Sequence, residues 1–244
     1  MKKVYWLAAA VLLPSIAGAQ IQERKWDVGT HLGLMSFDKG TGIDDAPFLG
    51  VDGTYHGLLK KWTGPLDLGI GFTFSAARPS TLGDQFPVIQ LDFGDTTFLY
   101  TVAQTITLLQ FGGQAVLGMD VGRFRVYTNG GTGGYSITTN PRQTTENETF
   151  VHEYWNLGLG LNYALRETVG IRLQGQSVWF TGFDRDRLDA TVGYAKDRRV
   201  RDALPAPHPE PSRGLAQNWA FSLVFSYIPS RVGGNDGPRG GEER

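Results

Sequence analysis

The residues best suited to acid–base or nucleophilic chemistry are few, because the chain has four histidines and no cysteine. His152 lies next to Glu153, and Ser177 offers a hydroxyl further along, so a hydrolase of the serine–histidine–carboxylate kind has to be considered. Neighbouring residues of an extended strand point to opposite faces, however, and His152 and Glu153 then cannot act together. We therefore predict no catalytic residues and keep a hydrolytic enzyme as the third-ranked hypothesis.

Two other patterns suggest ligand binding and are better explained by structure. His31 and His56 fall on the same face of their segments and are predicted to lie near one another, but a metal site needs more ligands. The glycine-rich run Gly130 to Gly134 opens no helix and precedes no Lys-Ser or Lys-Thr pair, as a phosphate loop would. We predict no metal and no cofactor.

Charged side chains form a more informative set if the segments that carry them are strands. Asp27, Asp52, Asp67, Arg125 and Arg172 then all point to the face opposite the apolar one. Isolated charges in a confined interior are costly, so these residues are expected to pair and to fill the space as a polar network. Removal of Arg172 is then expected to destabilise the protein and to open its interior.

The elements that position these residues are recognised by a period of two, which is typical of β-strands. At the residues 219, 221, 223, 225 and 227 large apolar side chains alternate with mostly small or polar ones. The same alternation occupies 155–163 and 66–75. Aromatic residues stand at both ends of two of these apolar faces, as in the pairs Trp155 with Tyr163 and Trp219 with Tyr227.

A soluble sandwich also alternates, but two details favour a transmembrane barrel. Aromatic residues belong where a lipid-facing band meets water, and glycine, serine, threonine and asparagine suit a narrow interior. On this register Leu159 faces lipid and Gly160 faces the interior, so that Gly160→Ser is expected to be the milder change. The fold class is therefore all-β: a closed, antiparallel, up-and-down transmembrane β-barrel.

Eight strands are predicted, and their connections alternate between short and long, as in outer-membrane barrels. One connection, Gln110 to Gly122, is too long for a short turn. A strand-like stretch at Val88 to Phe93 leaves a ten-stranded barrel as the alternative. The predicted strands cover residues 25–37, 47–59, 65–76, 96–109, 123–138, 151–165, 169–180 and 217–228.

The start of the chain predicts export. Lys2 and Lys3 precede ten apolar residues, and Ala17-Gly18-Ala19 then offers a cleavage site, so we predict a signal peptide over 1–19. The apolar run is too short for a spanning helix, which takes about twenty residues. The barrel is then expected over 20–228 and a polar, disordered tail over 229–244. A net charge of −1 gives no electrostatic reason to expect nucleic acid as a partner.

The chain resembles the OmpA-type superfamily of small outer-membrane β-barrel domain proteins. The resemblance covers most of residues 24–228 and rests on three segments, which run from Gly122 to Tyr135, from Trp155 to Tyr163 and from Val169 to Leu173. It implies the outer membrane of a Gram-negative-type bacterium, insertion by the barrel assembly machinery, and contact with outer-membrane lipid. Only about sixteen residues follow the last predicted strand, so the peptidoglycan-binding domain of this superfamily is not expected here.

The last long connection, 181–216, carries many charges of both signs. A solvated loop explains such a stretch, because loops are normally polar. The alternative is contact with lipopolysaccharide phosphates through Arg198, Arg199 and Arg201. The function that these patterns favour is a non-enzymatic barrel that contributes to envelope integrity or to surface contacts through its outer loops. A small-solute pore ranks second, and an outer-membrane lipid hydrolase or protease ranks third.

Overall fold

The computed structural model describes residues 25–58, 66–81, 89–93, 96–100, 105–140, 148–166, 168–188 and 212–228. Eight antiparallel strands close into one barrel in the order β1-β10-β9-β8-β7-β6-β3-β2, so each strand pairs with its sequence neighbour in the wall. The barrel strands are β1 (Trp26–Ser36), β2 (Ala46–Tyr55), β3 (Leu66–Ala77), β6 (Thr105–Val121), β7 (Phe124–Asn140), β8 (Glu148–Ala164), β9 (Val169–Asp184) and β10 (Arg213–Tyr227).

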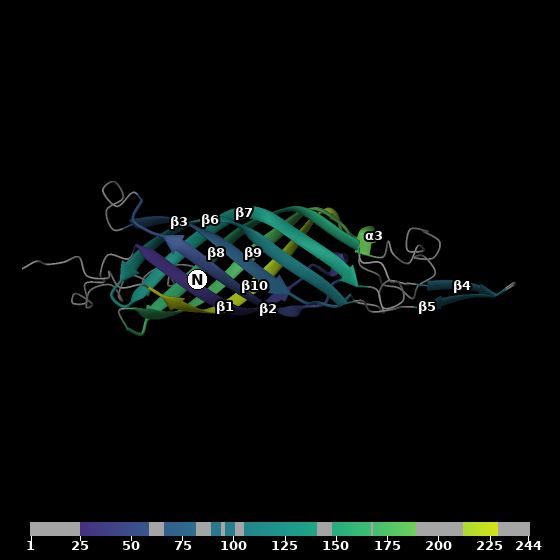
Figure 1. Ribbon diagram of the computed structural model, residues 1–244, viewed down its shortest axis with the longest axis horizontal. Coiled ribbons are helices and arrows are strands. Elements are labelled where there is room, and N and C mark those ends of the chain that lie inside the picture. The colour runs from purple at the N-terminus through teal and green to yellow at the C-terminus, as the bar shows by residue number, and fades with distance from the viewer. Residues whose placement is uncertain are drawn as a thin grey trace, which may run out of the picture.

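The strands run obliquely around the barrel axis (Figure 1). Following paired residues once around the wall leads from Arg125 on β7 to Tyr135 on the same strand, which is a stagger of ten residues (135 minus 125). With about 3.3 Å per residue and about 4.8 Å between strands, this stagger tilts the strands by roughly 40°. The intermediate partners are Asn162, Arg172, Val224, His31, Gly50, Ser75 and Gln110.

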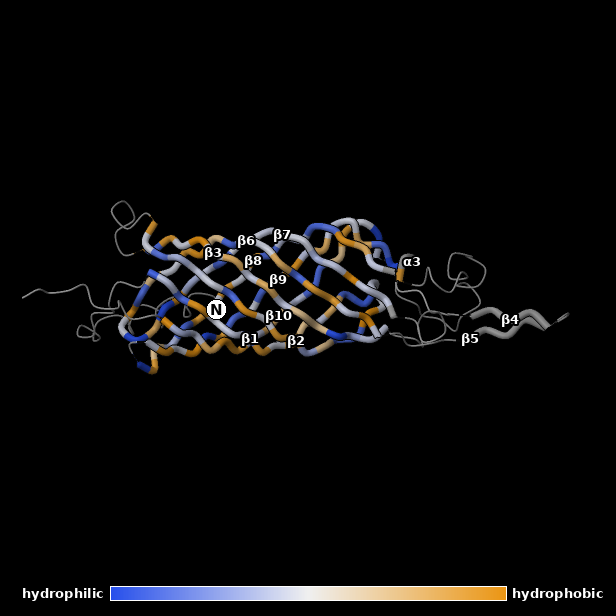
Figure 2. The backbone as a smooth tube through the Cα atoms, viewed as in Figure 1, coloured by the Kyte–Doolittle hydropathy of each residue, from blue (hydrophilic) through white to orange (hydrophobic). Residues whose placement is uncertain are grey.

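Successive side chains of a strand lie on opposite faces of the wall. Apolar and polar positions follow one another along most strands (Figure 2). The outer face carries the exposed large apolar residues, of which Leu159 is 70% exposed. Such a surface is stable in hydrocarbon and not in water. Among the described residues, no helix is long and apolar enough to cross a membrane.

Aromatic side chains mark both edges of this apolar band. At the end of the barrel with the short turns, Trp26 packs edge-on against Tyr55 with ring centroids 5.1 Å apart, and Phe124 lies 5.0 Å from Tyr163. At the opposite end, Trp155, Trp179 and Trp219 occupy outward positions on β8, β9 and β10. These two groups are the interfacial positions of a membrane-embedded barrel.

The connection from Gln110 to Gly122, which is too long for a short turn, is mostly part of strand β6. The predicted strand 96–109 was wrong: β6 begins at Thr105 and continues to Val121. Only Gly122 and Arg123 separate Val121 from its partner Phe124. Gly122 has φ +62°, the conformation that the first central residue of a tight hairpin turn requires.

The strand-like stretch near Val88 does form a strand, but not in the barrel. The strand β4 (Ile89–Phe93) pairs only with β5 (Thr96–Tyr100), and the two form a separate hairpin within the long β3–β6 connection. The barrel wall therefore has eight strands, and the ten-stranded alternative is wrong.

Backbone hydrogen bonds join the bases of the loops at the other end, which we call the loop end. The first loop contains the short helix η1 (Lys39–Thr41), and Gly40 accepts a hydrogen bond from Ser212 N at 2.8 Å. Asp44 N donates to Ser80 O, also at 2.8 Å. The helical turn α3 (Arg185–Leu188) follows β9 and places Leu188 in the interior. These hydrogen bonds join the bases of the β1–β2, β3–β6 and β9–β10 connections.

Candidate functional site: the barrel interior

The interior at the short-turn end holds a cluster of one histidine, one aspartate and one arginine. Arg125 Nη2 donates to Asp67 Oδ2 at 2.6 Å, and His56 Nδ1 lies 3.0 Å from the same oxygen. The other Asp67 oxygen accepts from Gly57 N at 2.7 Å, and Arg125 Nη1 is 3.6 Å from Asp120 Oδ2. Because Arg125 is only 4% exposed, this ion pair replaces the hydration that the guanidinium loses on burial.

A second cluster of the same three residue types lies deeper in the barrel. Arg172 Nη2 donates to Asp52 Oδ1 at 2.6 Å, and His31 Nε2 lies 2.5 Å from that oxygen. Arg172 extends from β9 past β10 and β1 to reach Asp52 on β2. It passes directly over Gly29, where any side chain would collide with both partners of the ion pair.

The five charges predicted to face the interior are all buried or partly buried there. The structure brings Arg125 to Asp67 and Arg172 to Asp52. Asp27 is also buried, at 3% exposure, but its Oδ1 has no hydrogen-bond partner among the described residues. The two histidines predicted to lie near one another instead belong to separate clusters. Among the described residues, no group of three or more His, Asp or Glu side chains is placed to hold a metal ion.

Neutral polar side chains fill the middle of the interior. Tyr127 donates to Gln174 Oε1 at 2.8 Å, and Ser75 donates to Gln110 Oε1 at 2.9 Å. A cavity of about 20 Å³ lies next to Gln110, with His31 among its lining residues. That volume holds about one water molecule.

The interior at the loop end is mostly apolar, although the side chain of Arg185 on α3 (Arg185–Leu188) is also buried at this end. Tyr135 and Phe180 stack there with ring centroids 4.2 Å apart, and both are fully buried. Leu188 of α3 and Phe183 close the cluster from above. We call this group the apolar cap. It comprises Met35, Phe37, Ile43, Ala46, Phe48, Ala77, Ile106, Leu108, Tyr135, Ile137, Phe150, Tyr154, Val178, Phe180, Phe183, Leu188, Ala216 and Ala220.

The outer face changes character at the same height. Beyond Trp155, Trp179 and Trp219 the outward positions become mostly polar, as with Glu153 on β8 and Thr181 on β9. The barrel therefore inverts its polarity along its length. Between the aromatic rings it is apolar outside and polar inside, and beyond the tryptophans it resembles a water-soluble β-barrel with its own core.

The residues considered for hydrolysis do not come together. His152 points inward, with its ring centroid 6.1 Å from that of Tyr135, whereas Glu153 and Ser177 occupy outward positions. The glycine run Gly130 to Gly134 lies within β7 and forms part of the barrel wall. The predicted signal peptide, the predicted tail and the three arginines Arg198, Arg199 and Arg201 lie outside the residues that the structure describes.

A closed antiparallel wall, an apolar outer band and aromatic residues at both of its edges define a transmembrane β-barrel. Residues 6–195 match the family model of the outer membrane protein beta-barrel domain, and the chain belongs to that family. The protein is accordingly an outer-membrane protein of a Gram-negative-type bacterium.

Solved structures that align with the chain are distant from it in sequence. Neisserial surface protein A aligns over 84% of this chain and 97% of its own, with a TM-score of 0.50 and 7% identity. The attachment invasion locus protein Ail of Yersinia pestis aligns over 83% and 96%, with a TM-score of 0.39 and 8% identity. The N-terminal β-barrel domain of OprF from Pseudomonas aeruginosa aligns over 82% and 97%, with a TM-score of 0.34 and 10% identity. No curated protein matches the chain.

Proposed function

We propose that this protein is a non-enzymatic, non-conducting component of the outer membrane that contributes to envelope integrity and presents its loop end for surface contacts. The observation that carries the proposal is the filled interior. An eight-stranded barrel is just wide enough for side chains to fill it. Here two ion-paired clusters occupy one end and the apolar cap occupies the other.

The apolar cap is the stronger argument against a small-solute pore. An ion crossing the barrel would have to displace fully buried residues such as Tyr135, Phe180 and Phe183, and would lose its hydration among apolar groups. The clusters of charge below the cap offer an ion no continuous path through the barrel.

The described part of the loop end supports a role in contacts outside the cell. The barrel continues beyond the outer tryptophans, and backbone hydrogen bonds join the bases of three loops there. The β4–β5 hairpin adds structure to the long β3–β6 connection. We include in the proposal the contact of Arg198, Arg199 and Arg201 with lipopolysaccharide phosphates, because arginine forms bidentate hydrogen bonds with phosphate oxygens. Insertion by the barrel assembly machinery is also part of the proposal.

Planar-bilayer recording of the refolded chain tests the proposal. We expect no steady single-channel current from protein whose folded state is verified by its heat-modifiable gel mobility. Steady conductance of the wild-type chain would replace the proposal with the small-solute pore. Assays with phospholipid and peptide substrates are expected to stay at the level of the blank, and turnover there would favour the enzyme instead.

A further inference from the structure

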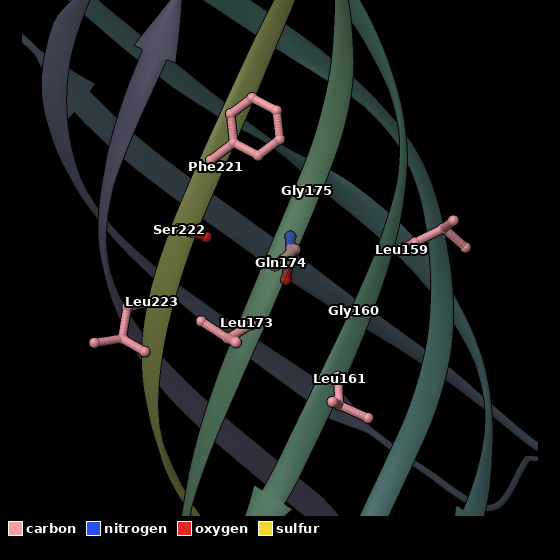
Figure 3. Close-up of a pocket in the computed structure, with 9 residues that line it drawn as sticks. All are labelled: Leu159, Gly160, Leu161, Leu173, Gln174, Gly175, Phe221, Ser222 and Leu223. Carbon is pink, nitrogen blue, oxygen red and sulfur yellow. The ribbon is translucent and has the colours of Figure 1, made fainter.

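The cavity of about 20 Å³ in the barrel interior lies where the polar residues meet the apolar cap. Cap residues such as Met35 and Val178 form one side of it. The other side is polar, and its side chains point inward from the wall. Figure 3 shows this direction on β9, where Leu173 stands outside the wall and Gln174 is turned into the barrel. Gln176, the next inward residue of β9, lines the cavity.

Two of the polar lining residues carry a buried atom that has no hydrogen-bond partner among the described residues. Gln110 on β6 accepts a hydrogen bond from Ser75 through its Oε1, at 2.9 Å, but its Nε2 has no partner. Asn156 on β8 has none at its Oδ1. Both residues are only 7% exposed, and a buried polar group without a partner loses its hydration uncompensated. One of these atoms is a donor and the other is an acceptor, so a ligand that satisfies both must accept and donate.

His31 on β1 also lines the cavity and supplies a second acceptor. Its Nε2 lies 2.5 Å from Asp52 Oδ1, and an ionised carboxylate can only accept, so Nε2 carries a hydrogen. In the neutral imidazole the other ring nitrogen, Nδ1, is then an acceptor. The three residues together require a ligand that accepts one hydrogen bond and donates two.

We propose that one structural water molecule binds in this cavity and bridges Gln110, Asn156 and His31. It accepts the amide hydrogen of Gln110 and donates its own two hydrogens to Asn156 Oδ1 and His31 Nδ1. The volume admits about one water molecule and excludes a hydrated ion or an organic ligand. The amide hydrogen of Gln110 excludes a metal ion, because it needs an acceptor. Through His31, this water joins the buried Asp52 ion pair to strands β6 and β8.

Solution NMR of the refolded protein in detergent micelles tests the proposal on the wild-type chain. We expect cross-relaxation between water and the Gln110 side-chain amide, with the sign of a water molecule that tumbles with the protein. The side-chain amide of Asn218 is the internal comparison, because it is fully buried, donates to Ala216 O and does not line the cavity. It should show no such signal. No signal at Gln110, or equal signals at both amides, would overturn the proposal.

Ala220→Val provides a second test, because Ala220 lines the cavity from β10 and two added methyl groups take the place of the water. Oxygen-17 relaxation dispersion should then count one long-lived water fewer than in the wild type. Ala216→Val is the matched control, since Ala216 lies on the same inward face of β10 but does not line the cavity. Its water count should not change. An unchanged count in Ala220→Val, or the same loss in both variants, would contradict the proposal, and the wild-type spectrum decides it if a variant does not refold.

Discussion

Arg172 on β9 and Asp52 on β2 form an ion pair across the barrel interior, with 2.6 Å between Nη2 and Oδ1. The two residues lie 120 positions apart in the sequence and are 6% and 1% exposed. Each charge offsets the hydration that the other loses on burial, because a lone charge at this depth has too little water around it. Four predictions follow from this interior and from the surface that surrounds it.

Arg172→Ala should lower the free energy of unfolding by about 3–5 kcal/mol, because it leaves the Asp52 carboxylate buried without its partner. The double variant Arg172→Met with Asp52→Leu removes both charges and should recover part of that loss. Urea titration in lipid measures both. The sequence alone led us to expect that removal of Arg172 opens the interior, but conductance should stay near zero in Arg172→Ala, because the apolar cap above the ion pair closes the barrel independently of it. A variant as stable as the wild type would mean that the ion pair contributes nothing.

Leu159→Arg should destabilise the inserted barrel by roughly 2–4 kcal/mol, because the side chain lies within the apolar band. Leu215→Arg is the matched control, since Leu215 is similarly exposed but lies beyond the outer tryptophans on β10. It should be nearly neutral. Insertion yield and urea titration measure the effect of both variants. Equal losses of stability at the two positions would show that the membrane boundary does not lie between them.

Gly160→Ala should destabilise the barrel by about 1–3 kcal/mol through overpacking. The sequence led us to expect a mild effect on the lumen side, but the Tyr127 ring lies directly against Gly160 and leaves no room for a Cβ. Gly130→Ala provides the comparison, because a Cβ there meets its nearest atoms at 3.7 Å. The prediction fails if thermal unfolding in detergent ranks the two variants in the opposite order.

Phe180→Ala should lower the free energy of unfolding by about 3–5 kcal/mol, because it removes a fully buried ring from the apolar cap. Tyr135 then loses the ring on which it stacks. Tyr135→Phe should cost only about 1 kcal/mol, since it loses one hydrogen bond, from the phenol to Thr181 O at 3.1 Å. Denaturant unfolding measured by tryptophan fluorescence separates the two variants. Similar stabilities would show that the cap is loosely packed.

The wall of the barrel could be predicted from the sequence because alternation of side chains is a local property. Seven of the eight strands were predicted close to their observed positions; β6 was misplaced because Gly112 and Gly113 interrupt its apolar pattern at mid-length. The inward direction of Arg172 also follows from alternation. The pairing of Arg172 with Asp52 does not follow from alternation. It depends on the ten-residue stagger of the closed wall, which no single strand encodes.

The apolar cap was missed for a related reason. Residues such as Ile137 and Phe150 lie near strand ends, where the sequence suggested rim and loop. They share the inward face with Asn129 and Asn156, so apolar residues occupy that face only in the upper part of the barrel. Had the alternation been followed to the ends of β7 and β8, the apolar residues on this inward face would have indicated a second core.

The inverted polarity of the barrel constrains how it enters the membrane. The polar outer surface of the upper part, with Glu153 and Thr181 on it, must cross the hydrocarbon layer before the protein reaches its final position. The apolar cap can shield its own side chains only after all eight strands have closed around it. We therefore expect the translocation of this upper part to limit the rate of insertion, so that the rate depends on the number of polar groups outside the cap more than on the ion pairs below it.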